Sequence, residues 1–136
     1  MRFISRCRYG GEMTVERDDF DCPLEFISFA KATVRQKFGS RPVGAIAGRY
    51  MWQEIWRKAA PLLGMEGRPA PDWLIHKDCL LVRDRFMAPD LLHLFIDGEQ
   101  LRGRIWAMAN GARVVREVEA QQPNVFRKAE ERRVAS

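Results

Sequence analysis

The chain has 136 residues, a length that predicts one folded domain rather than several. Hydrophobic residues make up 46% of the chain and charged residues 30%, which excludes a wholly disordered protein. The formal net charge is +5, so partners that carry negative charge are favoured over positively charged ones.

The N-terminal residues and the cysteines indicate the cellular compartment. No uncharged apolar run reaches the roughly 18 residues that a membrane-spanning helix needs. The first ten residues hold three arginines and lack the apolar centre of a signal peptide. Cys7, Cys22 and Cys79 are odd in number and widely spaced, which favours reduced thiols over a disulfide framework. We therefore expect a cytoplasmic protein with no membrane contact and no cofactor.

The N-terminal segment is expected to be extended. Residues 2–9 partly alternate between arginines and less polar side chains, as in a half-buried strand. Gly10 and Gly11 form a turn signal, and residues 13–16 can return as a second strand. The sequence predicts a short N-terminal strand or hairpin.

A helix is predicted next. Asp21 can cap it, Pro23 suits its first turn, and Glu25 complements its dipole. Apolar residues then recur at helical spacing, and Gly39 supplies a left-handed stop.

A second helix is predicted directly afterwards, from Ser40 as the cap to a close at Pro61 and Gly64. Gly44 and Gly48 lie four residues apart on it, which indicates close backbone packing. The sharper alternative is an anion site at the helix N-terminus, built from residues 39–41. Two helices with so short a link resemble a helix-turn-helix motif, but the small and apolar residues do not fall at the spacing that this motif needs.

Trp52 and Trp56 flank the apolar stripe of this second helix. We interpret them as core anchors rather than as platforms on which nucleic-acid bases stack.

An antiparallel β-meander is expected over residues 73–119. Short apolar runs are separated by turn signals, of which Asn110-Gly111 is the strongest because a type I′ hairpin favours that pair. Residues 90–95 can alternatively form a short helix after Pro89. The fold class predicted is α+β, with residues 1–120 as one compact domain and residues 121–136 as a charged tail.

The sequence contains no complete catalytic or metal-binding motif. His76, Cys79 and His93 could supply soft ligands, but a structural zinc site normally needs a further ligand pair. Asp90 and Glu99 resemble part of the PD-(D/E)xK nuclease pattern, although the spacing is too short and the lysine is absent. The predicted element order also resembles that of small basic ribonuclease toxins in architecture alone, which implies a ribonuclease-like enzyme as one alternative. Enzymatic activity is the less favoured expectation.

The basic residues are unevenly distributed. Residues 21–60 carry seven basic and three acidic side chains, and residues 101–136 carry eight and four. Such an excess can bind phosphate backbones by releasing counterions, but it can also serve only to keep the surface soluble. The residues expected to bind nucleic acid or another anion are Lys31, Arg35, Ser40, Arg41, Arg49 and Arg57.

We therefore expect a small regulatory or binding protein that engages DNA, RNA or a nucleoprotein complex through this basic surface. The main alternative is a protein-interaction module or inhibitor without nucleic-acid contact, using a sheet edge or an apolar patch around Trp73 and Trp106. A homodimer is compatible with either hypothesis.

Overall fold

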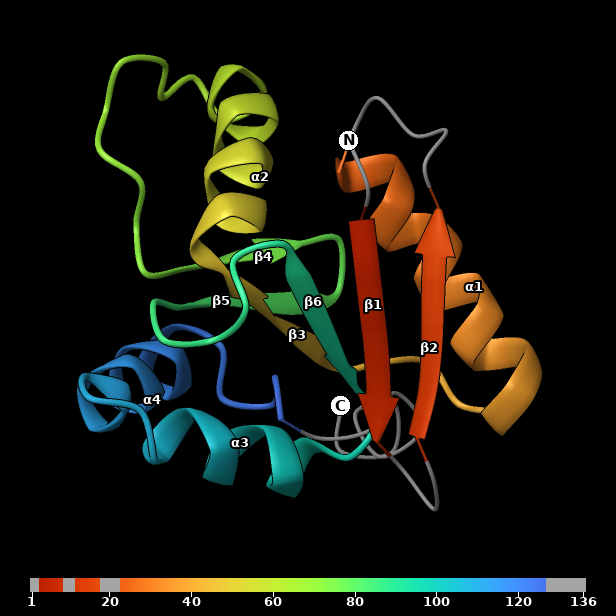
Figure 1. The fold of residues 1–136 in the computed structure, drawn as a ribbon. Helices are drawn as coiled ribbons and strands as arrows, with labels where there is room; N and C mark the ends of the chain where they lie inside the picture. The colour runs from red at the N-terminus through yellow and green to blue at the C-terminus, as the bar shows by residue number, and fades with distance from the viewer. Residues whose placement is uncertain (1–2, 9–11, 18–22, 127–136) are drawn as a thin grey trace.

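A computed structural model describes residues 3–8, 12–17 and 23–126. Its strands form one mixed sheet in the order β2-β1-β6-β3-β5-β4, with helices on both faces (Figure 1). The strands are β1 (Phe3–Arg8), β2 (Glu12–Arg17), β3 (Gly44–Gly48), β4 (Trp73–His76), β5 (Cys79–Asp84) and β6 (Leu91–Phe95). The helices are α1 (Pro23–Phe38), α2 (Arg49–Leu62), α3 (Gly98–Trp106) and α4 (Gly111–Gln121). The predicted α+β class is confirmed.

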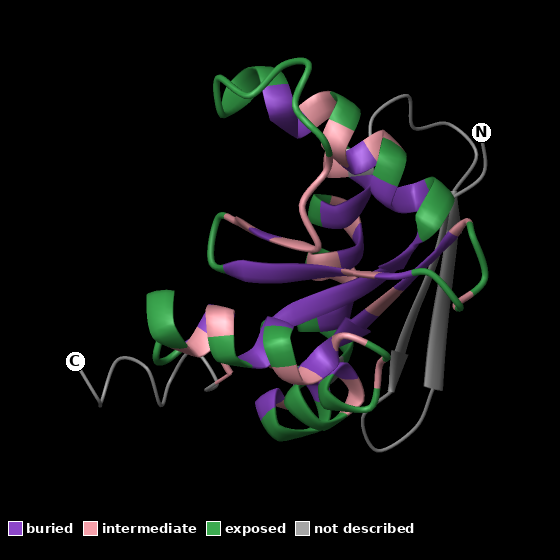
Figure 2. Cartoon of the chain, turned by 90° about the vertical axis from the view of Figure 1, so that its left-hand side faces the viewer, coloured by how far each residue is buried: buried purple, intermediate pink, exposed green. Residues whose placement is uncertain are grey.

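The sheet separates two hydrophobic cores. Helices α1 and α2 pack on one face, where Phe26 and Trp52 are fully buried. Helices α3 and α4 pack on the other face, where Leu101, Ile105 and Val114 are fully buried. Figure 2 shows the resulting layers, with buried central strands between helices whose outer sides are exposed. Because β3 and β5 are covered on both faces, their buried residues do not alternate with polar ones.

Several predicted elements are confirmed. Helix α1 matches the predicted first helix, and Gly39 follows it with a φ of 72°, the left-handed geometry that ends a helix. The predicted N-terminal hairpin corresponds to β1 and β2, which pair antiparallel. The cap proposed at Asp21 lies outside the described residues. Trp52 is a core anchor, as predicted, and its indole N–H donates to the Pro71 carbonyl at 2.9 Å.

The prediction of one helix from Ser40 onward is wrong. Residues 44–48 form β3 in the middle of the sheet, and α2 begins only at Arg49. A short strand buried on both faces has no period-two signature, and Ala47 falls in register with the apolar stripe of α2. The intervening strand also rules out a helix-turn-helix. The expected close packing is real, because a Cβ on Gly44 would lie 2.7 Å from the Leu80 carbonyl oxygen.

The predicted meander is only partly right. Strands β4 and β5 form an antiparallel hairpin, and residues 91–95 form a strand, not the alternative short helix. That strand, β6, pairs antiparallel with β3 and parallel with β1, so the sheet is mixed. Residues 98–106 and 111–121 are helices where strands were expected.

The dipeptides Asp97-Gly98 and Asn110-Gly111, which are typical of hairpin turns, account for this error. Asp97 is the N-cap of α3, since its carboxylate accepts from the backbone N–H groups of Glu99 and Gln100. At Gly111 a Cβ would lie 1.6 Å from the Ile105 carbonyl oxygen, so glycine lets α4 start against the end of α3. The valines on one side of α4 are buried in the core, and the free energy of this burial outweighs their preference for strands.

No helix among the described residues is both long enough and apolar enough to cross a lipid bilayer.

Candidate functional site

Two surface cavities with strongly charged linings lie at opposite ends of the parallel pair β3 and β5. The first, termed the basic pocket, lies where these strands begin. It has a volume of about 420 Å³ and is lined by Lys31, Ala32, Arg35, Gln36, Arg41, Pro42, Lys77 and Asp78. The second, termed the arginine pocket, lies where they end.

Three chain segments build the basic pocket. Helix α1 contributes Lys31 and Arg35 one turn apart, because residues four apart lie on the same side of a helix. The link into β3 contributes Arg41, and the tight turn between β4 and β5 contributes Lys77, whose φ is 58°. Residues far apart in the sequence therefore meet, and four basic side chains share the cavity with one carboxylate, Asp78.

The positive charge of this pocket is only partly neutralised. Lys31 Nζ lies 3.4 Å from Asp78 Oδ1. The side chains of Arg35, Arg41 and Lys77 have no hydrogen-bond or ion-pair partner in the part of the chain that the structure describes. The positive charge also affects the neighbouring His76. Burial, and then the charges of Lys31 and Lys77, hold the pKa of its imidazole below the usual 6.5. The pocket thus offers free cationic donors in a positive potential.

The structure brings together half of the predicted anion-binding residues. Lys31, Arg35 and Arg41 line the basic pocket, whereas Ser40, Arg49 and Arg57 do not. Arg49 begins α2 at the other end of β3, and Arg57 pairs with Glu54 on α2 at 2.8 Å. The alternative anion site at the N-terminus of the second helix is wrong, because α2 begins away from residues 39–41 and the Pro89 carbonyl accepts from the Tyr50 and Met51 N–H groups.

Lys77 was not among the predicted residues. In the sequence, Lys77-Asp78 only separates two short apolar runs that predict strands. A basic residue in a turn is a weak signal by itself, and only the crossing of α1 over this end of the sheet gives it a role.

The arginine pocket has a volume of about 310 Å³ and lies at the carboxyl ends of β3 and β5. It is lined by Asp72, Arg83, Asp84, Arg85, Phe86, Met108, Ala109, Asn110 and Arg113. Ligands of open α/β sheets commonly bind outside the carboxyl ends of the parallel strands. The pocket lies beside the carboxyl end of one such strand, β5.

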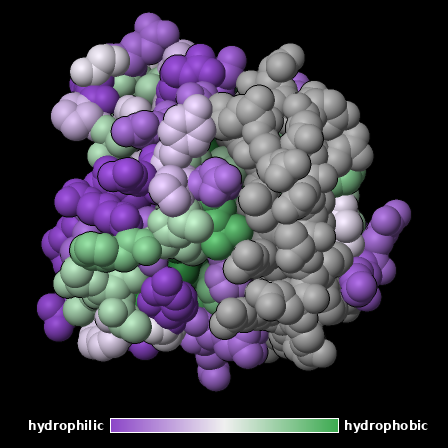
Figure 3. Space-filling model, in the orientation of Figure 1, coloured by the Kyte–Doolittle hydropathy of each residue, from purple (hydrophilic) through white to green (hydrophobic). Residues whose placement is uncertain are grey.

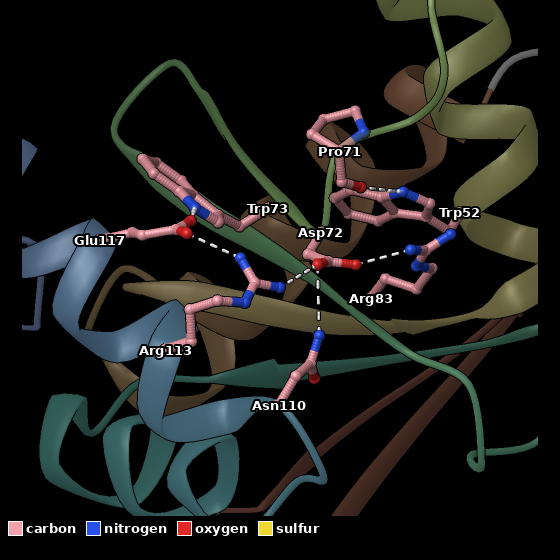
Figure 4. Close-up of polar contacts among 8 residues, drawn as sticks. All are labelled: Trp52, Pro71, Asp72, Trp73, Arg83, Asn110, Arg113 and Glu117. Carbon is pink, nitrogen blue, oxygen red and sulfur yellow. Dashed lines mark hydrogen bonds and ion pairs between the residues drawn. The ribbon is translucent and has the colours of Figure 1, made fainter.

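Asp72 is the centre of a polar network on one wall of this pocket (Figure 4). Its Oδ1 accepts from Arg83 at 2.6 Å, and its Oδ2 accepts from Asn110 at 3.2 Å and from Arg113. Partial burial alone would raise the pKa of Asp72, but the hydrogen bonds from Arg83 and Arg113 outweigh it and lower this pKa. Asp72 is therefore ionised at neutral pH and holds the two arginines in place.

The network extends through Arg113 to Glu117 and β4, and a separate ion pair, between Asp84 and Arg104, lies at the end of β5. Arg113 also donates to Glu117 at 2.7 Å, and the Trp73 indole N–H donates to the same carboxylate at 3.0 Å. These bonds, Trp73 first, lower the pKa of Glu117. Asp84, which is buried, accepts from Arg104 at 2.7 Å and from the Phe86 N–H at 2.9 Å.

Metal chemistry has no clear location among these residues. No group of three His, Cys, Asp or Glu side chains in the described ranges is arranged to hold an ion. His76 and Cys79 are register partners across the β4–β5 hairpin, and the Cys79 thiol is buried in the core and forms no disulfide.

Helix α3 carries Trp106, which is 46% exposed. The Arg102 guanidinium carbon lies over the Trp106 ring, 5.6 Å from the ring centroid.

Comparison with known proteins finds no matching family model, no matching curated protein and no matching solved structure. Function is therefore inferred from the two pockets themselves.

Proposed function

We propose that the protein binds nucleic acid through the phosphate backbone, and that the basic pocket is the contact site. The observation that supports this is the meeting of four basic side chains from three segments around one carboxylate. Arginine and lysine are the usual ligands of backbone phosphates, and neutralised phosphates release counterions that favour binding.

The lining also indicates which part of the nucleic acid is contacted. No aromatic side chain of the described residues lines the basic pocket, so the stacking by which single-stranded bases are held has no platform there. The free groups are one ammonium and two guanidinium groups, which pair with phosphate oxygens. We infer that binding is independent of base sequence and depends strongly on salt.

The experiment compares the two halves of the predicted residue set. Fluorescence anisotropy with a labelled DNA duplex and a labelled RNA strand would be measured for wild type, R35Q/R41Q and R49Q/R57Q. Both double variants lose two charges, but only the first pair lines the basic pocket. We expect the first variant to weaken binding about tenfold or more and the second to have a much smaller effect.

Equal losses in the two double variants would contradict a localised site and would leave only a diffuse effect of net charge. Absence of binding by the wild-type protein to either nucleic acid at low salt would contradict the proposed function itself. Circular dichroism on all three proteins would establish that the variants are folded.

A protein partner is the second candidate function. The end of α2 and the residues after it expose Leu62, Leu63 and Met65, and Leu62 is 78% exposed. Exposed apolar side chains in one place are typical of protein-binding surfaces. A nuclease-resistant complex that is lost in L62S/L63S would favour this function over nucleic-acid binding.

A further inference from the structure

The arginine pocket is distinct from the basic pocket in position and chemistry. Strand β5 separates them: Lys77 and Asp78 at its start line the basic pocket, and Asp84, Arg85 and Phe86 at its end line the arginine pocket. A ligand in the arginine pocket therefore does not depend on nucleic-acid binding at the other end of the sheet.

The acidic groups of the arginine pocket already have partners. Both carboxylate oxygens of Asp72 accept hydrogen bonds from arginine or asparagine side chains. Both oxygens of Asp84 are likewise occupied, one by Arg104 and one by the Phe86 N–H. These carboxylates fix the arginines rather than offering free acceptors to a ligand.

Hydrogen-bond donors, in contrast, are in excess. A guanidinium has five N–H groups, and Arg83 uses only its Nη2 in a side-chain bond within the described part of the chain. Arg85 is exposed and has no described side-chain partner. Asn110, which precedes α4, donates to Asp72 and makes no side-chain cap to the helix. The surplus donors call for a ligand that accepts hydrogen bonds, and the guanidinium forks fit an oxyanion.

The rest of the rim is apolar. Phe86 is 87% exposed, and Met108 lines the same cavity. Figure 3 shows hydrophobic residues gathered over the region of the β5–β6 loop and of α3 and α4, among hydrophilic surface. An exposed phenyl ring beside guanidinium groups favours a ligand that has a flat apolar part next to its charged part.

We propose that the arginine pocket binds an organic phosphate of mononucleotide size. The phosphate lies against Arg85 and the arginines fixed by Asp72, and the flat ring of the ligand contacts Phe86. A volume of about 310 Å³ is at the lower end of the range for small-molecule pockets, which favours a mononucleotide over a dinucleotide.

Isothermal titration calorimetry would test this with adenosine 5′-monophosphate, adenosine and inorganic phosphate as probes. We expect saturable binding of the monophosphate, and binding of the other two probes that is at least about tenfold weaker. No saturable binding of the monophosphate would overturn the proposal. Inorganic phosphate binding as tightly as the monophosphate would also overturn it, because the ring would then contribute nothing.

Variants localise the site. R85Q removes an exposed charge without touching the Asp72 network, and F86A removes an exposed ring, so both should remain folded. Each variant should bind the monophosphate about tenfold more weakly than the wild type does. Arg116 is exposed on α4 outside the pocket, so R116Q is the matched control and should bind like wild type. Equal losses in R85Q and R116Q would contradict the location.

A labelled oligonucleotide distinguishes the two sources of such a phosphate. If the natural ligand is free in solution, R85Q binds an oligonucleotide with a 5′-phosphate as wild type does. If it is the end of a nucleic acid, the 5′-phosphate increases the affinity of the wild type and not of R85Q. Either result supports the pocket, provided that the monophosphate binds.

Discussion

Asp72, directly before β4, accepts a hydrogen bond from Arg113 of α4, 41 residues later in the chain. Together with Arg83 and Asn110, this bond ties the second helical layer to the edge of the sheet. The contact therefore has a structural role as well as a place in the arginine pocket.

Replacing Asp72 by asparagine should lower the free energy of unfolding by about 1–2 kcal/mol, because the negative charge between two guanidinium groups is lost and an NH2 group replaces one of the two acceptor oxygens. Urea denaturation would measure it. E119Q is the matched control, since the pair of Glu119 with Arg102 is exposed on both sides and should cost less than about 1 kcal/mol. A D72N variant as stable as E119Q would show that the network contributes nothing.

Gly48 at the end of β3 should not tolerate a side chain. A Cβ there would lie 2.0 Å from the Ala88 carbonyl oxygen, so G48A forces the backbone apart and should cost about 1–3 kcal/mol. Gly103 lies in α3 with no neighbour within 4 Å of the added atom, and G103A should instead stabilise by roughly 0.5–1 kcal/mol. Thermal melts of the two variants should therefore shift in opposite directions. A shift in the same direction would be inconsistent with the close approach at Gly48.

The Asp97 cap should contribute to the stability of α3. Replacing Asp97 by alanine removes both hydrogen bonds to the first turn and should cost about 1 kcal/mol. The Glu99 side chain lies in the same turn and makes no capping bond, so E99Q should cost only a few tenths of a kcal/mol. The comparison uses chemical denaturation at one pH, and equal costs would show that the capping bonds do not stabilise the helix.

His76 should make stability depend on pH. Its pKa in the folded protein is lowered, by burial first and then by Lys31 and Lys77, so below the usual 6.5 the unfolded chain binds more protons than the folded one. The free energy of unfolding should therefore fall as the pH is lowered from about 7.5 to about 5. H76Q should show a smaller fall over the same interval. An identical pH profile in both proteins would mean that His76 titrates normally.

Sequence reasoning succeeded where one signal dominated. Helix α1 has a periodic apolar face and is followed by Gly39, and both signals can be read from the sequence. It failed for β3, whose small buried residues carry no alternation, and for α4, where valines suggested a strand. In both cases burial by distant elements decides the conformation, and that information is not local.

The residues of the candidate sites also differ in whether local sequence signals or contacts between distant elements identify them. Arg35 and Arg41 are basic residues near the end of a predicted helix, so composition alone could single them out. The joining of Lys77 to them depends on how α1 crosses the sheet. Asp72, Arg83 and Arg113 meet only because α4 is a helix that packs beside β4, and the predicted meander could not have placed them together.

The most direct test of phosphate binding at the basic pocket is the salt dependence of nucleic-acid affinity in wild type, R35Q/R41Q and R49Q/R57Q. The logarithm of the binding constant should fall linearly with the logarithm of the salt concentration. Removing Arg35 and Arg41 should reduce the steepness of that line by about one unit for each phosphate that the variant no longer neutralises. The R49Q/R57Q line should keep the wild-type slope. The same slope in all three proteins would contradict the assignment of the phosphate-binding residues to the basic pocket.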